Sequence, residues 1–318
     1  MQKPLQTGYT ARTTTNDVIK NIDLTGKTVI ITGGSAGLGL ETTKTLAEAG
    51  ATVIVPARNI NKASDALSDL PNVELYPAEM DLSKRETIEI FVQWFQKKYE
   101  KLDILINSAG IMAIPLARDK YGNEFQVATN YLGHYYLTKA LIPQLKNAHG
   151  ARIVNLSSRA HWLGSFNFAD PNFKATDYDK WVAYGQSKTA VSLFSVAMDE
   201  LFKNDNIRSF TVHPGSIVTN LSHNLSDKEM TSMGAITAAG KRGYESYNDE
   251  NKTIPEGAAT IVWCATSPQL AGYGGIYCEN CDIAPLAIDD SKRIGVKPWA
   301  VDKDLDLKLW KETSNLFQ

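Results

Sequence analysis

A tyrosine and a lysine one helical turn apart are the residues of this sequence best suited to proton transfer. Tyr184 and Lys188 lie four positions apart in the stretch AYGQSK. On a helix, residues i and i+4 project from one face, so we expect the ammonium of Lys188 to lie near the phenol of Tyr184 and to lower its pKa. A phenol with the ordinary pKa of about 10 rarely ionises at neutral pH. The pair therefore predicts an acid–base group.

A glycine-rich turn upstream of this pair is typical of a dinucleotide site. The stretch TGGSAGLG at residues 32–39 interrupts an apolar run and opens a helix-like segment. Glycines let the backbone approach a pyrophosphate, and the free N–H groups at the N-terminus of the next helix meet its charge. The two motifs together predict a protein that holds a dinucleotide and moves a proton beside it.

The elements that position these motifs alternate between apolar runs and helix-period segments. This alternation predicts an α/β fold: a single Rossmann-type, doubly wound domain with a seven-stranded parallel sheet and helices on both faces. A capping box, Ser83-x-x-Glu86, marks the start of the third helix. We expect strands at Lys27–Thr32, Thr52–Pro56, Val73–Ala78, Asp103–Asn107, Arg152–Ser157, Ile207–Val212 and Gly275–Tyr277, and helices at Leu38–Ala49, Ile60–Leu70, Ser83–Tyr99, about Asn123 to Leu145, and Trp181–Phe202.

The chain divides into one domain with two appendages. We expect an N-terminal arm at residues 1–23, the domain at 24–285 and a tail without an assigned role at 286–318. Residues 216–247, rich in Ser, Thr, Gly and Asn, interrupt the alternation beside the expected cleft. This segment predicts a lid over a ligand site, with a solvated helical insertion as the alternative.

Further motifs, in a fixed order, resemble those of the classical short-chain dehydrogenase/reductase family. They are NSAG at residues 107–110, Asn130, Ser158 and HPG at residues 213–215. The resemblance runs from about Leu24 to Pro285, and the stretches ATNYLGHYYLT, RIVNLSSRAH and AYGQSKTA are most similar to the retinol dehydrogenase and WW-domain oxidoreductase branch. It implies an oxidoreductase that transfers a hydride between a nicotinamide and a carbonyl or alcohol substrate, which we expect to be hydrophobic.

The resemblance implies four catalytic residues. Tyr184 would protonate the carbonyl oxygen, and Ser158 would hydrogen-bond that oxygen and stabilise its developing charge. Lys188 would also bind the nicotinamide ribose, and Asn130 would hold a water that links Lys188 to solvent. Ser157 is the neighbour most easily confused with Ser158.

The resemblance also implies where the cofactor binds. The glycine turn would meet the pyrophosphate, Asp81 and Leu82 the adenine, the NSAG segment the adenosine ribose, and the residues after HPG the nicotinamide. The expected cofactor-binding residues are Gly33, Ser35, Gly37, Leu38, Gly39, Arg58, Asp81, Leu82, Asn107, Ala109, Gly110, Tyr184, Lys188, Pro214, Gly215, Ile217 and Thr219.

The end of the second strand favours NADP over NAD as the cofactor. An NAD enzyme typically carries an acid there for the ribose 2′-hydroxyl, whereas this chain has Ala57, Arg58 and Asn59. A guanidinium without a neighbouring carboxylate suits a 2′-phosphate. The family's other basic position, just before Gly37, holds Ala36, so NAD stays open as an alternative.

Composition limits the partners of the chain. Its 318 residues carry 33 basic and 35 acidic side chains, a formal net charge of −2, with no long block of one sign, which argues against nucleic acid or an anionic membrane. The polar start and the absence of a bilayer-length apolar run predict a cytoplasmic protein without a membrane span. Cys278 and Cys281 form one C-x-x-C, which could be redox-active or half of a metal site, but a metal needs more ligands nearby. The histidines have no ligand spacing, so we expect no metal. The expected partner is a small molecule, and a homodimer or homotetramer is common in the family.

Two other functions are compatible with parts of the sequence. Gly33-x-Ser35-x-Gly37 matches the nucleophile elbow of an α/β-hydrolase, in which Ser35 would act with Asp199 and His213. A catalytically silent cofactor sensor on the same fold is the second alternative. Such a sensor usually loses the proton-handling pair, which is intact here.

Aromatic residues between Ser158 and Tyr184 have two equally supported interpretations. They either wall an apolar pocket for a bulky carbonyl compound or attach the loop to the core. These residues are Trp162, Phe166, Phe168, Phe173, Tyr178 and Trp181.

Overall fold

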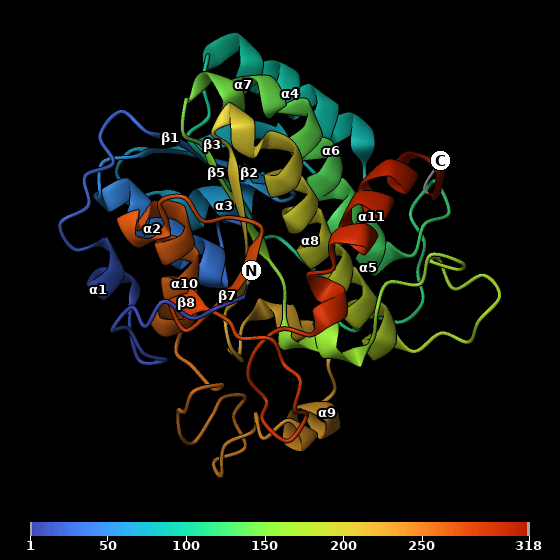
Figure 1. The fold of residues 1–318 in the computed structure, drawn as a ribbon. Coiled ribbons are helices and arrows are strands. Elements are labelled where there is room, and N and C mark those ends of the chain that lie inside the picture. The colour runs from blue at the N-terminus through green and yellow to red at the C-terminus, as the bar shows by residue number, and fades with distance from the viewer. Residues whose placement is uncertain (1, 317–318) are drawn as a thin grey trace.

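An eight-stranded sheet crosses the middle of the molecule, with helices on both faces (Figure 1). The computed structural model describes residues 2–316. The sheet order is β3-β2-β1-β4-β5-β6-β7-β8, in which the first seven strands are parallel and β8 pairs antiparallel with β7. The predicted parallel sheet is thus confirmed, and β8 is an addition too short to have a sequence signal. The strands are β1 Thr28–Thr32, β2 Thr52–Ala57, β3 Val73–Glu79, β4 Ile104–Asn107, β5 Arg152–Leu156, β6 Arg208–His213, β7 Ile276–Glu279 and β8 Asp282–Ile283.

Both faces of the sheet are covered, and this explains the continuous apolar runs of its strands. Every residue of β1 is buried. Ile30 belongs to the core cluster on the side of α4, α6, α8 and α11, whereas Val29 and Ile31 belong to the cluster on the side of α1, α2 and α10. Successive side chains of a strand point to opposite faces, so a doubly covered strand is apolar at each position. The helices are α1 Thr15–Ile19, α2 Gly37–Glu48, α3 Ile60–Leu67, α4 Arg85–Lys98, α5 Phe125–Val127, α6 Gly133–Ala140, α7 Ile142–Asn147, α8 Lys180–Phe202, α9 Asp227–Ser232, α10 Ile254–Thr266 and α11 Lys303–Leu316.

The long helix predicted from about Asn123 to Leu145 is wrong as a single element. The chain instead forms α5, a π-helical turn at Ala128–Leu132, α6 and α7. Pro143 lies in the first turn of α7, where its missing N–H does no harm, but it could not continue a helix from α6. The π-helical turn contains Asn130, and such turns often occur at functional sites.

The predicted capping box at Ser83 is also wrong. The Ser83 hydroxyl donates to the Asp81 carboxylate at 2.8 Å, and α4 begins at Arg85. Glu86 pairs with Lys120 at 2.7 Å instead of capping the helix. The turn before α4 is therefore organised by Asp81, a residue at the edge of the expected cofactor site.

Two helices that the sequence did not predict complete the helical layers. Most of α10 is buried, so its sequence lacks the apolar stripe by which a half-exposed helix is recognised. The tail forms α11, which packs on α8 through the buried Leu309 and the ring of Trp310. The N-terminal arm runs beside β8, where Leu5 and Gln6 donate backbone hydrogen bonds to Asp282.

The strand order predicts a crevice beyond the carboxyl ends of the central strands. From β1 the chain proceeds to β2 and β3 on one side, and then β4 returns to the other side of β1. In open α/β sheets, ligands bind beyond the carboxyl ends of the strands at such a reversal. The glycine turn after β1 lies at this point.

Candidate active site

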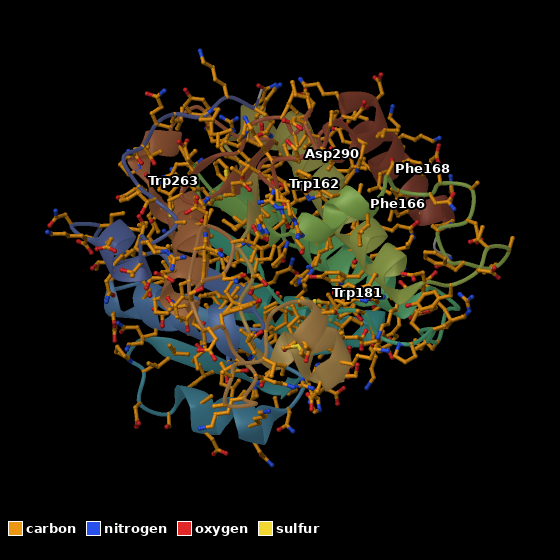
Figure 2. The ribbon with its side chains drawn as sticks, turned by 90° about the horizontal axis from the view of Figure 1, so that it is seen from below. Trp162, Phe166, Phe168, Trp181, Trp263 and Asp290 are labelled. Carbon is orange, nitrogen blue, oxygen red and sulfur yellow. The ribbon has the colours of Figure 1, made fainter. Side chains whose placement is uncertain are left out.

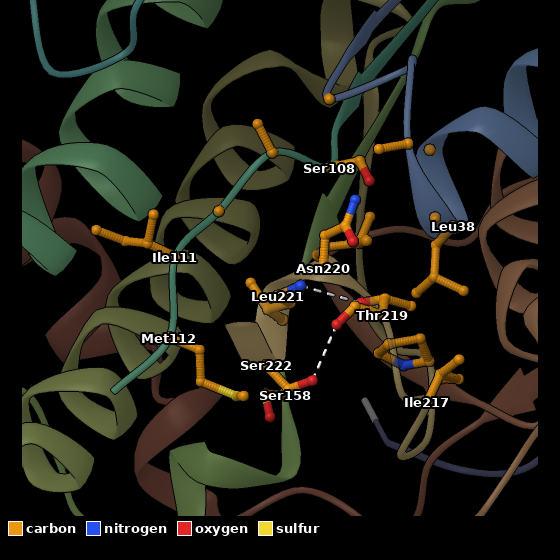
Figure 3. Close-up of a pocket in the computed structure, with 18 of the residues that line it drawn as sticks. Leu38, Ser108, Ile111, Met112, Ser158, Ile217, Thr219, Asn220, Leu221 and Ser222 are labelled. Carbon is orange, nitrogen blue, oxygen red and sulfur yellow. Dashed lines mark hydrogen bonds between the residues drawn. The ribbon is translucent and has the colours of Figure 1, made fainter. Parts of the chain in front are cut away.

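One cavity of about 660 Å³ extends from the glycine turn to Tyr184. Figure 3 shows Ile111 and Met112, which follow β4, on one side and Leu221 and Ser222 of the 216–247 segment across from them. Most of the predicted site residues line this cavity: Gly33, Ser35, Gly37, Leu38, Gly39, Arg58, Asp81, Leu82, Ala109, Gly110, Ser158, Tyr184, Lys188, Pro214, Gly215, Ile217 and Thr219. Asn107 and Asn130 are the predicted residues that do not.

The glycine turn is folded so tightly that only glycine fits at its last position. A Cβ atom on Gly39 would lie 2.2 Å from the carbonyl oxygen of Gly33. Gly33 itself has φ +69° and passes close to Ala109. The helix that follows, α2, has no side-chain cap at Ala36, so its first N–H groups lack a side-chain acceptor. These donors and the close turn fit a pyrophosphate.

A buried threonine and a buried histidine connect the glycine turn to the loop that follows β4. Thr32 Oγ1 accepts hydrogen bonds from Ser108 N and Ala109 N and lies 2.9 Å from His134 Nε2. His134 Nδ1 lies 2.9 Å from the carbonyl oxygen of Asn130, which can only accept, so Nδ1 carries the proton and Nε2 accepts from Thr32. Burial lowers the pKa of His134 to about 4, so the ring is neutral at pH 7. The sequence analysis did not single out either residue for this role.

Ser158 is the serine that faces Tyr184. The Ser157 hydroxyl donates to the carbonyl oxygen of Lys188 at 2.9 Å and is buried. Ser158 is half-buried. Burial raises the pKa of Tyr184 to about 12, and the neighbouring Ser158 hydroxyl opposes this effect. The phenol is therefore protonated at neutral pH and can act as a proton donor.

Lys188 lies beside Tyr184 but does not lower the pKa of the phenol in this structure. Its Nζ donates to the carbonyl oxygen of Leu156 at 2.8 Å and lies 5.6 Å from the centre of the Tyr184 ring. Lys188 is only 5% exposed, and burial lowers its own pKa to about 8. The expected lowering of the tyrosine pKa is thus wrong here, because burial of the phenol sets the direction of its pKa shift.

The two asparagines predicted in the site are turned away from the cavity. Asn130 bonds both backbone groups of Ile111 and the Ser187 hydroxyl through its amide. Its oxygen nevertheless lies near Lys188, since both would contact a Cβ atom placed on Gly110. Asn107 donates to Asn155 and Thr138, so its amide nitrogen joins β4 to its neighbours, and its contact with a cofactor stays a prediction.

The other end of the cavity carries two cations. Arg58 and Lys62 both line the cavity after β2, together with Asn59, which caps α3 by accepting from Lys62 N. Within residues 2–316, neither cationic side chain is held in an ion pair with a carboxylate. Lys62 was not predicted as a site residue, although its position one turn after Arg58 at the start of a helix could have indicated it.

The 216–247 segment, which contains α9, forms part of the cavity wall. Two backbone hydrogen bonds join the start of the segment to the chain that follows its end. The N–H of Ser216 donates to the carbonyl oxygen of Glu250 at 2.6 Å, and the carbonyl oxygen of Ser216 accepts from the N–H of Lys252 at 3.0 Å. Lys180 of α8 pairs with Glu229 of α9 at 2.6 Å. The segment also contributes residues to the cavity wall, among them Met230, Met233 and Tyr244.

The aromatic residues between Ser158 and Tyr184 divide between the two expected roles. Trp162 and Trp181 line the cavity. The rings of Phe166 and Phe168 contact each other edge to face, with centroids 4.9 Å apart, and pack against the core cluster that contains the buried residues of α8. Figure 2 shows this pair beside α11, apart from Trp181. Phe166 and Phe168 thus attach the loop to the core, whereas the role of Trp162 and Trp181 in binding a carbonyl compound stays a prediction.

The hydrolase alternative lacks its catalytic partners. His213 places Nε2 3.2 Å from the Glu250 carboxylate, and its Nδ1 accepts from Arg159 N. Asp199 forms a two-bond ion pair with Arg208. Within residues 2–316, neither side chain bonds Ser35, so no charge-relay arrangement reaches that hydroxyl.

Comparisons with known proteins agree with this geometry. The family model described as short chain dehydrogenase matches residues 27–230. A Streptomyces lividans protein named "Probable oxidoreductase" is 38% identical over 294 residues, which cover 91% of this chain and 97% of the relative. Mouse retinol dehydrogenase 12 is 31% identical, over 93% of this chain and 88% of its own length.

Solved structures share the fold. An uncharacterized protein from Mycobacterium paratuberculosis has a TM-score of 0.71 at 29% identity, over 96% of this chain and 97% of that one. The Brucella melitensis 3-ketoacyl-(acyl-carrier-protein) reductase complexed with NADH has a TM-score of 0.61 at 22% identity, over 80% and 96%, and this likeness concerns the fold alone. In residues 2–316, no helix is long and apolar enough to span a membrane, and no group of three or more His, Cys, Asp or Glu side chains could hold a metal.

Proposed function

The chain belongs to the short-chain dehydrogenase family, and on this basis we propose that it is an NADP-preferring oxidoreductase acting on a hydrophobic carbonyl compound or the corresponding alcohol. The family binds a nicotinamide cofactor. One observation carries the proposal: the Ser158 and Tyr184 hydroxyls, with Lys188 behind them, face the same cavity as the glycine turn. A proton donor and a dinucleotide cradle in one cavity are what such a reaction requires.

Each of the proposed catalytic residues has a distinct task. The reduced cofactor, when bound, supplies the hydride. Tyr184 donates its proton to the carbonyl oxygen, and the Ser158 hydroxyl hydrogen-bonds that oxygen as negative charge develops on it. Lys188 contributes a cation behind the phenol and binds the cofactor ribose, and Asn130 keeps the Ile111 backbone beside Lys188. Oxidation of an alcohol uses the same groups in reverse.

Each part of the cofactor is assigned to a different group of residues along the cavity. The glycine turn and the N-terminus of α2 would meet the pyrophosphate, and Asp81 and Leu82 would border the adenine. The turn after β6, at residues 214–219, would border the nicotinamide. We propose that Arg58 and Lys62 hold a 2′-phosphate, because two cations without carboxylate partners favour a doubly charged anion.

Replacing Arg58 by aspartate tests this cofactor preference. The carboxylate repels a 2′-phosphate and can accept from a ribose hydroxyl, so we expect the ratio of kcat/KM for NADPH to that for NADH to fall by at least about tenfold. The measurement is initial rates with both reduced cofactors. Arg85→Asp on α4, which makes the same charge change outside the cavity, is the control. An unchanged ratio would remove Arg58 from the phosphate site.

The raised pKa of Tyr184 predicts different pH profiles in the two directions. Because that pKa is about 12, the phenol is protonated at neutral pH, as reduction requires. Oxidation needs the phenolate, whose population rises about tenfold per pH unit below the pKa. We expect kcat for alcohol oxidation to rise between about pH 7 and pH 10, while kcat for reduction does not rise. Parallel profiles in both directions would contradict the role of Tyr184.

The substrate side of the cavity favours an apolar compound. Trp162, Trp181, Met112, Met230 and Met233 all line it. Aromatic and methionine side chains offer large, adaptable apolar surfaces. The first experiment is a panel of ketones and aldehydes with NADPH and NADH, and of alcohols with NADP and NAD, followed by the absorbance of the reduced nicotinamide. Lack of turnover in every combination, with tight cofactor binding retained, would favour the catalytically silent sensor.

The segment 216–247, the location of the protein and its oligomeric state are further subjects of proposal. We propose that residues 216–247 act as a lid over the substrate end of the cavity, supported by their contribution to its wall and by the Lys180–Glu229 pair. A cytoplasmic location and a homodimer or homotetramer stay predictions from the sequence and the family. Sedimentation of the purified protein would decide the second.

A further inference from the structure

A histidine that plays no part in the proposed chemistry lies directly behind Ser158. His161 is fully buried in the 3₁₀ turn Arg159–Leu163, which begins after Ser158. Its Nδ1 lies 2.7 Å from the carbonyl oxygen of Ser158, and its Nε2 lies 3.1 Å from the N–H of Lys297. One imidazole thus bridges the proposed catalytic serine and the C-terminal tail.

The hydrogen bonds fix the protonation of this ring. The carbonyl oxygen of Ser158 can only accept, so Nδ1 carries a proton and donates it. The N–H of Lys297 can only donate, so Nε2 is unprotonated. Burial lowers the pKa of His161 to about 3, which keeps the ring neutral at pH 7. Both contacts therefore select the same neutral tautomer, and the Tyr277 hydroxyl, 3.2 Å from Nδ1, is a further partner of the protonated nitrogen.

The tail holds this turn at several points besides His161. The indole N–H of Trp299 donates to the carbonyl oxygen of His161 at 3.0 Å. The carbonyl oxygen of Gly295 accepts from Arg159 at 2.7 Å and from the indole of Trp162 at 3.2 Å. The tail at residues 295–299 is thus hydrogen-bonded to three residues of the turn that follows Ser158, namely Arg159, His161 and Trp162.

The same turn packs against α8 beside Tyr184. A Cβ atom on Gly185, the residue after Tyr184, would lie 2.6 Å from the carbonyl oxygen of Ala160. Thr189 of α8 donates to the carbonyl oxygen of Gly164 at 2.9 Å. The turn is therefore seated between α8 and the tail, and a shift in its position would change the separation of the Ser158 and Tyr184 hydroxyls.

We infer that His161 is a positioning residue for Ser158, whose carbonyl it ties to the C-terminal tail so that the serine hydroxyl stays in register with Tyr184. This inference rests on the proposed function. It assigns a role to tail residues 295–299, for which the sequence offered none. The ring does not touch the substrate; it acts through the backbone of Ser158.

Three substitutions at His161 separate this role from general stabilisation. In His161→Asn, the side-chain amide can take the place of Nδ1 and keep the donor to Ser158 O. In His161→Gln, the amide reaches the position of Nε2 and can keep the acceptor for Lys297 N but not the donor. His161→Leu keeps much of the buried volume and removes both bonds. The matched measurements are kcat, the KM for substrate, the Kd for NADPH and the urea unfolding curve of each full-length protein.

We expect kcat to fall by about tenfold or more in His161→Leu and His161→Gln, and to stay within about threefold of wild type in His161→Asn. The Kd for NADPH should change little in all three, because the ring does not line the cofactor cavity. The comparison of His161→Asn with His161→Gln tests the positioning role even if His161→Leu does not fold. Equal kcat in these two variants, or losses that follow only the unfolding midpoints, would overturn the inference.

The failure of this inference differs from failure of the proposed function. If the wild-type protein turns over carbonyl compounds but His161→Gln is equally fast, only the positioning role is lost. If the wild-type protein turns over none of them, the proposed function is lost, and this inference with it. Nitrogen NMR of the wild-type histidines gives a readout without turnover: His161 should show a proton on Nδ1 and remain neutral down to about pH 5. A proton on Nε2 would also overturn the inference.

Discussion

Replacing Tyr184 by phenylalanine is expected to lower kcat by about two to four orders of magnitude, the range over which a positioned general acid accelerates a reaction. The substitution removes one oxygen atom from a side chain that is 3% exposed, and it leaves the ring in contact with Trp181. The fold and the glycine turn should be unaffected. The Kd for NADPH should therefore change by less than about threefold.

The measurement is steady-state reduction with saturating cofactor, together with cofactor titration by fluorescence. Tyr76→Phe is the matched control, because Tyr76 is equally buried but lies in β3 outside the cavity. Its kcat should match that of the wild-type protein. Turnover retained by Tyr184→Phe would refute the assignment of the proton donor, and a large loss of cofactor affinity would show that the variant reports on binding instead.

Replacing Ser158 by alanine is expected to lower kcat by about 100-fold to 1,000-fold, as removal of one oxyanion donor does in other enzymes. The physical reason is that the Ser158 hydroxyl would be bonded to the reacting oxygen most strongly when that oxygen carries negative charge. The substrate KM should change much less than kcat, since the bond is weaker before the charge develops.

The neighbouring serine provides the comparison for this prediction. Ser157 is bonded to the backbone of α8 through Lys188 O, so Ser157→Ala should cost about 1 kcal/mol of unfolding free energy and a much smaller factor in kcat. Both variants can be assayed at the same temperature, well below the unfolding midpoint. A larger kcat loss in Ser157→Ala than in Ser158→Ala would reverse the assignment.

Local signals in the sequence were sufficient for the parts of the site that depend on neighbouring residues. The turn at 32–39 and the pair Tyr184 and Lys188 are defined by spacing along one element, so the structure brings them to one cavity as expected. The strands β1, β2 and β4 were found because each consists mainly of buried apolar residues. The packing of the C-terminal tail could not be predicted in this way. The helix α11 is amphipathic, but its sequence does not indicate that it packs on α8.

Features that depend on burial in three dimensions could not be predicted. The direction of the Asn107 side chain follows from Asn155 and Thr138, which are distant in sequence. The helix α10 escaped prediction because burial on most sides removes the amphipathic pattern. The predicted direction of the Tyr184 pKa shift is wrong for the same reason. The spacing indicates a charged neighbour but not that the phenol is buried.

The most direct test of the account is the transfer of deuterium from reduced cofactor in which both hydrogens on the reactive carbon of the nicotinamide are replaced by deuterium. A single turnover with a hydrophobic ketone, followed by mass spectrometry of the product, measures the transfer in wild-type protein and in Tyr184→Phe. We predict one deuterium on the former carbonyl carbon in the wild-type product, and transfer slowed at least about 100-fold in the variant. Product formed without deuterium, or transfer at equal rates in both proteins, would contradict a hydride enzyme that relies on Tyr184 as its proton donor.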